Sequence, residues 1–228
     1  MQTSLAMHAI YEFGSEEQKD FYLPVMAKGD KLGCFGLTEA DAGSDPASMK
    51  TKAIEKDGGY VLNGSKNWIT NSPIADVLII WAKDEQEILR GFIVDRDSKG
   101  LSTPKIDGKF ALRASTTGQI FLEDVFVAKD KMLPNVQSFR GPFSCLNMAR
   151  YGIAWGAMGA AEFCWEASLN YSLERVQFGK PLAAKQLVQK KLADMQTEIT
   201  IGLQSVLRLG RLIDDNKICL LYTSDAAD

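Results

Sequence analysis

The sequence of 228 residues is poor in histidine, has no closely spaced cysteines and has no long apolar run. It contains a single histidine, His8, and four cysteines without a Cys-x-x-Cys pair. Structural zinc sites need clustered cysteine and histidine ligands, so we expect no metal site. Cys34 and Cys164 lie in apolar surroundings, which favours buried, reduced thiols over disulfide partners.

Neither sign of charge dominates the chain. The formal net charge is −3 and no long basic run is present, which argues against a nucleic-acid partner. The longest apolar runs, such as Val77–Ala82, are far shorter than the roughly 20 residues of a membrane-spanning helix. The first residues do not have the pattern of a signal peptide. These absences predict a soluble globular protein without membrane insertion.

Residues 1–30 have a helical pattern. Ser15, followed by Gln18 at the third helical position, has the form of a capping box that begins a second helix. The apolar residues Leu5 and Ile10 have no earlier segment to pack against. We therefore interpret residues 1–30 as the end of a helical N-terminal domain.

Residues 31–135 have short β-branched and aromatic runs separated by Gly, Asn, Asp and Pro, which predicts strands. In the segment Gly59–Lys66, the pair Asn63-Gly64 predicts a hairpin turn. The spacing of the runs predicts a compact antiparallel barrel or sandwich. The other candidate strands are Val77–Ala82, Gly91–Asp95 and Gly118–Leu122.

Residues 140–217 return to a helical period. Met148–Arg175 is rich in glycine and alanine, as in a buried bundle helix. An apolar stripe with steps of three and four residues predicts a second long helix; its members are Leu192, Met195, Ile199, Leu203, Val206, Gly210 and Ile213. Residues 218–228 do not continue the stripe and resemble translated adapter sequence, so we exclude them from the fold.

The densest polar constellation is the loop Cys34–Pro46. Glycines allow close approach of the backbone, and hydroxyls such as Thr38 and Ser44 suit a polar heterocycle or a phosphate. From these residues alone, a turn-rich surface loop is as good an interpretation as a ligand loop. The segment does not have the Gly-x-Gly-x-x-Gly pattern, which excludes a Rossmann site.

Four segments, taken in order, resemble the signatures of the acyl-CoA dehydrogenase family. They are Phe35–Asp45, Asn63–Asn71, Leu112–Val127 and Arg175–Met195. Three further segments resemble the glutaryl-CoA dehydrogenase branch of that family, namely Gly33–Glu39, Gly108–Ser115 and Gly141–Gly156. The resemblance implies an α+β multidomain fold with a helical N-terminal remnant, a β-barrel-like middle domain and an incomplete C-terminal helical bundle.

The resemblance also implies FAD as the cofactor. Thr38 would donate to the flavin ring, Trp68 would pack beside it, and Arg175 would reach the FAD of a neighbouring subunit. Without the resemblance, these three residues could be a strand-end hydroxyl, a core aromatic residue and a solvated helix-end arginine. The implied FAD-binding residues are Phe35, Gly36, Leu37, Thr38, Glu39, Gly43, Ser44, Trp68, Ile69, Thr70, Arg175 and Gln186.

The implied substrate is an acyl-CoA thioester, most specifically glutaryl-CoA, which is oxidised and decarboxylated to crotonyl-CoA. The alternatives are a fatty acyl-CoA dehydrogenase that does not decarboxylate, or an inactive flavin-binding fragment. The implied substrate-binding residues are Ser44, Phe143, Asn147 and Arg150.

The family's catalytic base is a glutamate in a Tyr-Glu-Gly-Thr type motif, which we expect after Lys217, so no catalytic residue is assigned. The arginine for a distal carboxylate is expected before Met1. The implied partners are an electron-transfer flavoprotein and further copies of the chain, arranged as a dimer of dimers. The implied location is the cytoplasm of a bacterium or the mitochondrial matrix of a eukaryote.

Overall fold

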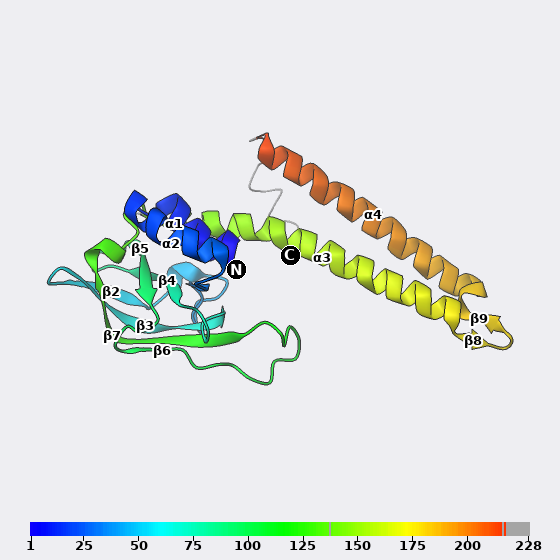
Figure 1. Ribbon diagram of the computed structural model, residues 1–228, viewed down its shortest axis with the longest axis horizontal. Coiled ribbons are helices and arrows are strands. Elements are labelled where there is room, and N and C mark those ends of the chain that lie inside the picture. Colours follow the sequence, from blue (N-terminus) through cyan, green and yellow to red (C-terminus); the bar gives the residue numbers. More distant parts are fainter. Residues whose placement is uncertain (137, 216, 218–228) are drawn as a thin grey trace. The chain divides into compact units, whose positions relative to one another are not determined.

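The computed structural model of the protein describes residues 1–136, 138–215 and 217 (Figure 1). The excluded segment 218–228 lies outside the described residues. Contacts within the chain divide it into two compact units, Met1–Met148 and Ala149–Asp228, and each is described by itself. Among the described residues, no helix is both long enough and apolar enough to cross a membrane.

The first unit begins with three short helical segments. They are η1 (Gln2–Met7), a π-helix, followed by α1 (His8–Phe13) and α2 (Glu16–Lys28). The predicted capping box is confirmed, because the Ser15 hydroxyl accepts from the Gln18 N–H at 3.2 Å and the Gln18 side chain accepts from the Ser15 N–H at 3.0 Å. Gly29, at φ 82°, ends α2 in the left-handed conformation that glycine adopts readily.

The expectation that Leu5 and Ile10 lack packing partners is wrong. Both side chains are buried, because these helices pack on the sheet beside its first strand. The Gln2 side chain joins the layers, since its oxygen accepts from the Gly33 N–H at 2.6 Å while its amide donates to the Met26 carbonyl at 3.0 Å. The helices are therefore part of the first unit's fold.

Seven strands form one sheet in the first unit. They are β1 (Gly33–Gly36), β2 (Lys52–Lys56), β3 (Gly59–Thr70), β4 (Val77–Lys83), β5 (Leu89–Asp95), β6 (Leu101–Ser102) and β7 (Thr117–Ala128). The order is β1-β4-β2-β3-β7-β6, and β5 also pairs with β4. Two short 3-10 helices, η2 (Pro46–Ser48) and η3 (Lys129–Lys131), follow β1 and β7.

The predicted strands are confirmed, but the sheet is not wholly antiparallel as expected. β1 pairs with β4 in parallel over its whole length, while β5 pairs with β4 in an antiparallel register. The parallel pair arises because the β2–β3 hairpin is inserted between β1 and β4, and parallel neighbours need such a long crossover connection.

The predicted turn at Asn63-Gly64 is also wrong. β2 and β3 join instead through Asp57-Gly58, a pair of the same turn-forming type. Gly64, at φ 150°, lies inside β3 where the register with β7 shifts. The Asn63 side chain donates to the Asp124 carboxylate and accepts from the Asp124 N–H, both at 2.9 Å. The Asn-Gly pair therefore lies within a long strand, opposite a β-bulge in β7 where Glu123 and Asp124 face Asn63 alone.

The main core cluster of the first unit takes Leu78, Ile80 and Ala82 from one face of β4. The alternate residues Val77, Ile79 and Trp81 are buried as well, so β4 is covered on both faces. Other buried members come from β1, β3, β5 and β7, namely Cys34, Leu62, Ile69, Phe92, Val94, Ile120, Leu122, Val125 and Val127. The rigid strand ends that carry polar motifs are anchored in this core.

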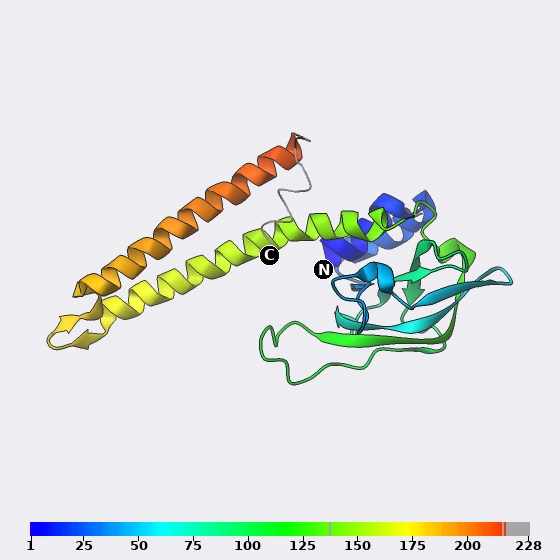
Figure 2. The ribbon, with the colours of Figure 1, turned by 180° about the vertical axis from the view of Figure 1, so that it is seen from behind.

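The second unit is built from long helices that run side by side in opposite directions (Figures 1 and 2). Helix α3 (Arg140–Glu174) begins in the first unit, and α4 (Gln186–Asp214) follows a small hairpin. The hairpin consists of β8 (Val176–Gln177) and β9 (Lys180–Pro181), and the 3-10 turn η4 (Leu182–Ala184) connects it to α4. The Trp165 indole donates to the Leu192 carbonyl at 3.0 Å and so ties the two helices together.

The apolar stripe on α4 is confirmed in position, since Ile199 and Val206 are buried. The expectation for the cysteines is half right. Cys34 is buried in the sheet, but Cys164 is exposed on α3. Position 164 lies about 100° around the helix from Trp165, which faces α4, so its apolar sequence neighbours do not cover it.

Candidate functional site

Two motif segments converge at the ends of β1 and β3. The Asn67 N–H donates to the Thr38 carbonyl at 2.9 Å, so the loop after β1 lies directly against the bulged end of β3. The Asn71 side chain adds a longer contact, 3.5 Å from its amide to the Gly33 carbonyl. Thr38 and Trp68, which the sequence assigned to one ligand, therefore lie on neighbouring backbone segments.

The first residues of this loop face the core. Phe35, Gly36 and Leu37 are buried, and the Phe35 ring packs edge-on against Trp81 with centroids 5.6 Å apart. Only the backbone of these three residues can face a ligand. Gly43 and Ser44 are exposed further along, and an added Cβ at Gly43 would have nothing within 4 Å. The loop thus runs from a fixed strand end to an open surface.

Trp68 has an unusual backbone. Its φ is 58°, in the left-handed region that is costly for a bulky side chain, and its indole is 59% exposed. It lies where the register of β3 against β7 shifts between Lys66 and Ile69. The Asn67 side chain accepts from the Trp68 N–H at 3.0 Å and supports this conformation. The bulge turns the indole outward, while buried Ile69 anchors the strand and Thr70 is half-buried.

A buried ion pair lies beneath these residues. The Lys66 ammonium is 2.8 Å from the Glu39 carboxylate, and the two side chains are 0% and 8% exposed. The same carboxylate accepts from the Thr51 N–H at 3.0 Å and hydroxyl at 2.5 Å, and from the Lys50 N–H at 2.6 Å. The carboxylate therefore has four partners within the protein, while the predicted role of Glu39 at the cofactor stays a prediction.

Burial and attraction act in opposite directions on the pair. Burial lowers the pKa of Lys66 to about 8, although the charge of Glu39 and its hydrogen bond favour the ammonium form. Burial alone would raise the pKa of Glu39, but Lys66, the Lys50 N–H and Thr51 together hold that pKa below its usual value. Both groups are charged at neutral pH.

The role of Lys66 was not predicted from the sequence. The available signal was its strand position, because Leu62 and Lys66 are both buried and share the period-two face of β3. Thr51 carried no comparable signal, since its contact with Glu39 comes from tertiary structure.

In the second unit, Arg175 and Gln186 frame the β8–β9 hairpin. Arg175 follows α3 and is exposed, and its carbonyl accepts from the Leu182 N–H at 2.9 Å. The hairpin turn, Phe178-Gly179, has φ values of 54° and 72°, which leaves the Phe178 ring 95% exposed. Gln186 is the exposed first residue of α4. Both predicted contact residues are thus exposed, one before the hairpin and one after the 3-10 turn that follows it.

Phe143, Asn147 and Arg150 follow one another along α3 with spacings of four and three residues, which is one face of a helix. Phe143 is exposed, with its ring centroid 6.2 Å from that of Phe139. Asn147 and Arg150 are half-buried. The helix therefore presents an aromatic ring, an amide and a guanidinium in a line.

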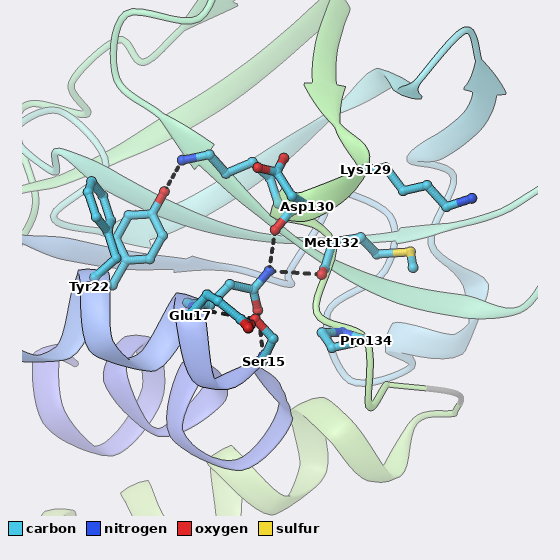
Figure 3. A pocket seen from close by; sticks show the side chains of 10 residues that line it. Ser15, Glu17, Tyr22, Lys129, Asp130, Met132 and Pro134 are labelled. Carbon is cyan, nitrogen blue, oxygen red and sulfur yellow. Dashed lines mark hydrogen bonds between the residues drawn. The ribbon is translucent and has the colours of Figure 1, made fainter.

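A pocket of about 580 Å³ lies elsewhere in the first unit (Figure 3). It is lined by α2 and by residues around η3, and not by the described residues of the two converging segments. The Gln18 amide closes one wall by donating to the carbonyls of Asp130 at 2.6 Å and Met132 at 3.0 Å. Lys131 contacts the Tyr22 hydroxyl on another wall. These contacts attach α2 to the sheet.

The chemistry of the converging segments suits a planar ligand with a polar edge. An outward indole offers an aromatic face, and the hydroxyls of Thr38, Ser44 and Thr70, in the same two segments, offer hydrogen bonds. Among the described residues, no group of three or more His, Cys, Asp and Glu side chains could hold a metal ion.

Comparison with known proteins relates the chain to one family along its length. Residues 1–30, 34–125 and 139–227 match, in order, the acyl-CoA dehydrogenase N-terminal, middle and C-terminal domains. The probable acyl-CoA dehydrogenase YngJ of Bacillus subtilis is 41% identical over 230 residues, which is 98% of this chain and 60% of that protein. The chain thus spans about three fifths of this relative's length.

Solved structures give the same relationship. Glutaryl-CoA dehydrogenase from Mycobacterium smegmatis is 46% identical with a TM-score of 0.95, over 98% of this chain and 57% of that one. A second structure of a glutaryl-CoA dehydrogenase from that organism, in complex with FADH2, is 44% identical with a TM-score of 0.93. The match covers 96% of this chain and 56% of that one. From its sequence and its fold, the chain belongs to the acyl-CoA dehydrogenase family.

Proposed function

We propose that the chain supplies the flavin-binding part of an FAD-dependent acyl-CoA dehydrogenase, which removes hydrogen from the α and β carbons of an acyl-CoA thioester. The observation that carries this proposal is the convergence of Thr38 and Trp68 through the 2.9 Å contact between the Asn67 N–H and the Thr38 carbonyl. The FADH2-bound relative supports the choice of ligand. In this proposal residues 1–30, 31–135 and 140–217 belong to successive domains.

The residues at the convergence fit a flavin. The exposed Trp68 indole provides a face for packing, and the strained backbone that presents it is typical of a functional position. The Thr38 and Thr70 hydroxyls donate to polar edges of the ring, and a donor near the accepting atom stabilises developing charge. FAD, when bound, supplies the acceptor for a hydride. The other predicted residues contribute backbone atoms along the same edge of the flavin and set the spacing there. They are Phe35, Gly36, Leu37, Glu39, Gly43, Ser44 and Ile69.

Arg175 and Gln186 serve the FAD of a neighbouring subunit in this proposal. A guanidinium can hold two phosphate oxygens at once, and Arg175 is exposed at the base of a defined hairpin. The working enzyme is then a homo-oligomer, a dimer of dimers, because each flavin needs residues of two chains. Electrons leave through an electron-transfer flavoprotein.

We further propose glutaryl-CoA as the substrate, with release of CO2 and formation of crotonyl-CoA. Its support is the likeness to two solved structures named glutaryl-CoA dehydrogenase. Ser44, Phe143, Asn147 and Arg150 contact the acyl-CoA. No residue of the chain is assigned the removal of the α-proton, so the chain by itself binds flavin without dehydrogenating. The second candidate is a fatty acyl-CoA dehydrogenase that leaves the carbon chain intact, as the name of the Bacillus subtilis relative allows.

Flavin binding tests the main proposal. The chain is mixed with FAD and filtered, and we expect yellow flavin to stay with the protein and Trp68→Ala to weaken binding about tenfold. Filtration that removes all flavin would contradict the proposal. Rapid bleaching of the bound flavin by glutaryl-CoA would contradict the expected inactivity. For the substrate, the longer protein that contains this chain is offered glutaryl-CoA and butyryl-CoA, and CO2 release from glutaryl-CoA separates the two candidates.

A further inference from the structure

The Lys66 side chain crosses the inside of the first unit to reach the loop after β1. Its ammonium lies 2.8 Å from the Glu39 carboxylate, 3.1 Å from the Leu37 carbonyl and 3.8 Å from the Met49 sulfur. A fully buried lysine must find partners for its charge, and here all of them belong to the segment 37–49. One strand residue therefore holds several points of one loop.

Glu39 closes the other side of the same loop. Its carboxylate binds the backbone and hydroxyl of Thr51 and the backbone N–H of Lys50, just before β2 begins. Glu39 also pairs with Ala42 through two backbone hydrogen bonds of 3.2 Å. The loop is thereby fixed at its start, at its first turn and at its end.

The residues held in this way are neighbours of those that present the ligand surface. Thr38 stands between Leu37 and Glu39, both of which contact Lys66. Trp68 follows Lys66 by two positions, and the Asn67 N–H between them binds the Thr38 carbonyl. The ion pair and the Asn67–Thr38 hydrogen bond therefore join the same two backbone segments.

A buried ion pair is a poor device for stability alone. Taking both charges out of water is costly, and well-packed apolar residues often stabilise a fold as much or more. The pair instead adds structural specificity, because its hydrogen bonds define one arrangement of the loop after β1 against β3. Such a device is expected where geometry matters more than stability.

We propose that Glu39 and Lys66 are positioning residues, whose buried ion pair sets the Thr38 hydroxyl and the Trp68 indole at the spacing that flavin binding requires. This inference rests on the proposed function. Neither side chain contacts the ligand, since both are occupied within the protein. The pair acts through Asn67 and Trp68 on one side and through Leu37 and Thr38 on the other.

The test compares this pair with another ion pair of the same unit. Asp84 and Arg90 lie 2.9 Å apart with side chains 10% and 22% exposed, and neither belongs to the converging segments. Full-length chains with Glu39→Gln, Lys66→Met, the double change, or Asp84→Asn are compared at a temperature where each is folded. The double variant carries no unpaired buried charge, so it keeps the test valid if Lys66→Met alone fails to fold.

Two measurements are made on each variant. Hydrogen exchange of the Asn67 amide reports the contact with Thr38 without any ligand, and fluorescence titration reports the affinity for FAD. We expect Glu39→Gln, Lys66→Met and the double change to speed this exchange and to weaken FAD binding by about tenfold each. Asp84→Asn should leave the Asn67 exchange rate and the FAD affinity within about twofold of the unchanged chain. This should hold even if it lowers the melting temperature as much as the Glu39 and Lys66 changes do.

Unchanged Asn67 exchange in the double variant would overturn the proposal. So would a loss of FAD affinity that follows the melting temperature equally in Asp84→Asn, because the effect would then be general destabilisation. If the unchanged chain itself binds no FAD, the proposed function fails, while the exchange measurement still decides whether the pair positions Thr38 and Trp68.

Discussion

The Lys66 ammonium and the Glu39 carboxylate meet at 2.8 Å inside the sheet, and the backbone next to each of them carries a residue of the proposed flavin surface. This relationship joins two motif segments that are far apart in the sequence. It also separates the roles within the first motif, since Glu39 supports the loop from inside while Thr38 and Ser44 reach toward its surface.

The buried ion pair makes the free energy of unfolding depend on pH in the alkaline range. The pKa of Lys66 in the folded chain is lowered to about 8 by burial, below the value of about 10.4 expected when unfolded. Between these values the unfolded chain binds a proton that the folded chain has released. The free energy of unfolding from this group should therefore rise as the pH increases through that window. Urea denaturation from pH 7.5 to 10 measures it.

Lys66→Met is the control for this pH effect, and its stability curve should lack the rise. A wild-type curve that matches that of Lys66→Met across the window would refute the assignment. On the acid side the free energy of unfolding also rises with pH, because the pKa of Glu39 is lowered in the folded state. Its contribution is present above its unfolded pKa and is lost as the pH falls through the folded pKa.

Gly64→Ala should destabilise the chain by about 2 kcal/mol. Gly64 has φ 150°, and an added Cβ would lie within 2.6–2.8 Å of Thr51 atoms, which are themselves bound to Glu39. Gly43→Ala is the matched control, since nothing lies within 4 Å of its new Cβ, and it should change stability by less than about 0.5 kcal/mol. Equal melting temperatures for both variants would show that position 64 tolerates a side chain.

Trp68→Gly should separate stability from binding. The left-handed φ of 58° is costly for tryptophan but not for glycine, and the indole is 59% exposed. We therefore expect stability within about 1 kcal/mol of the unchanged chain, with FAD affinity about tenfold lower. Phe110→Ala, which removes a 96% exposed ring of the same unit, should affect neither quantity. A large loss of stability in Trp68→Gly would indicate a core role instead.

Gln18→Ala should cost more than Ser15→Ala. The serine supplies one cap hydrogen bond, typically about 1 kcal/mol. Gln18 completes the cap and also donates to the carbonyls of Asp130 and Met132, so its loss removes three part-buried hydrogen bonds at about 1 kcal/mol each. Urea denaturation of both variants measures the difference. Equal losses would mean that the wall contacts in Figure 3 add nothing to stability.

The sequence by itself determined the elements whose causes are local. The Ser15–Gln18 capping box depends on residues within one helical turn, and the stripe through Ile199 and Val206 depends on helical period alone. The strands at Val77–Ala82 and Gly91–Asp95 follow from runs of side chains suited to a buried sheet. The motif order was sufficient to indicate the family, because it needs no knowledge of which segments touch.

Only the tertiary structure decided the relationships that join distant segments. Asn63-Gly64 lies within a strand because Asp124, in a bulge of the neighbouring strand, provides the hydrogen bonds that a turn would otherwise use. Cys164 is exposed because the packing of α3 beside α4 places Trp165, and not Cys164, at the contact between the two helices. The ion pair between Lys66 and Glu39 forms only when β3 lies against the loop after β1. The left-handed backbone of Trp68 likewise depends on this arrangement. Such contacts depend on loop closure and on competing partners, which no local pattern encodes.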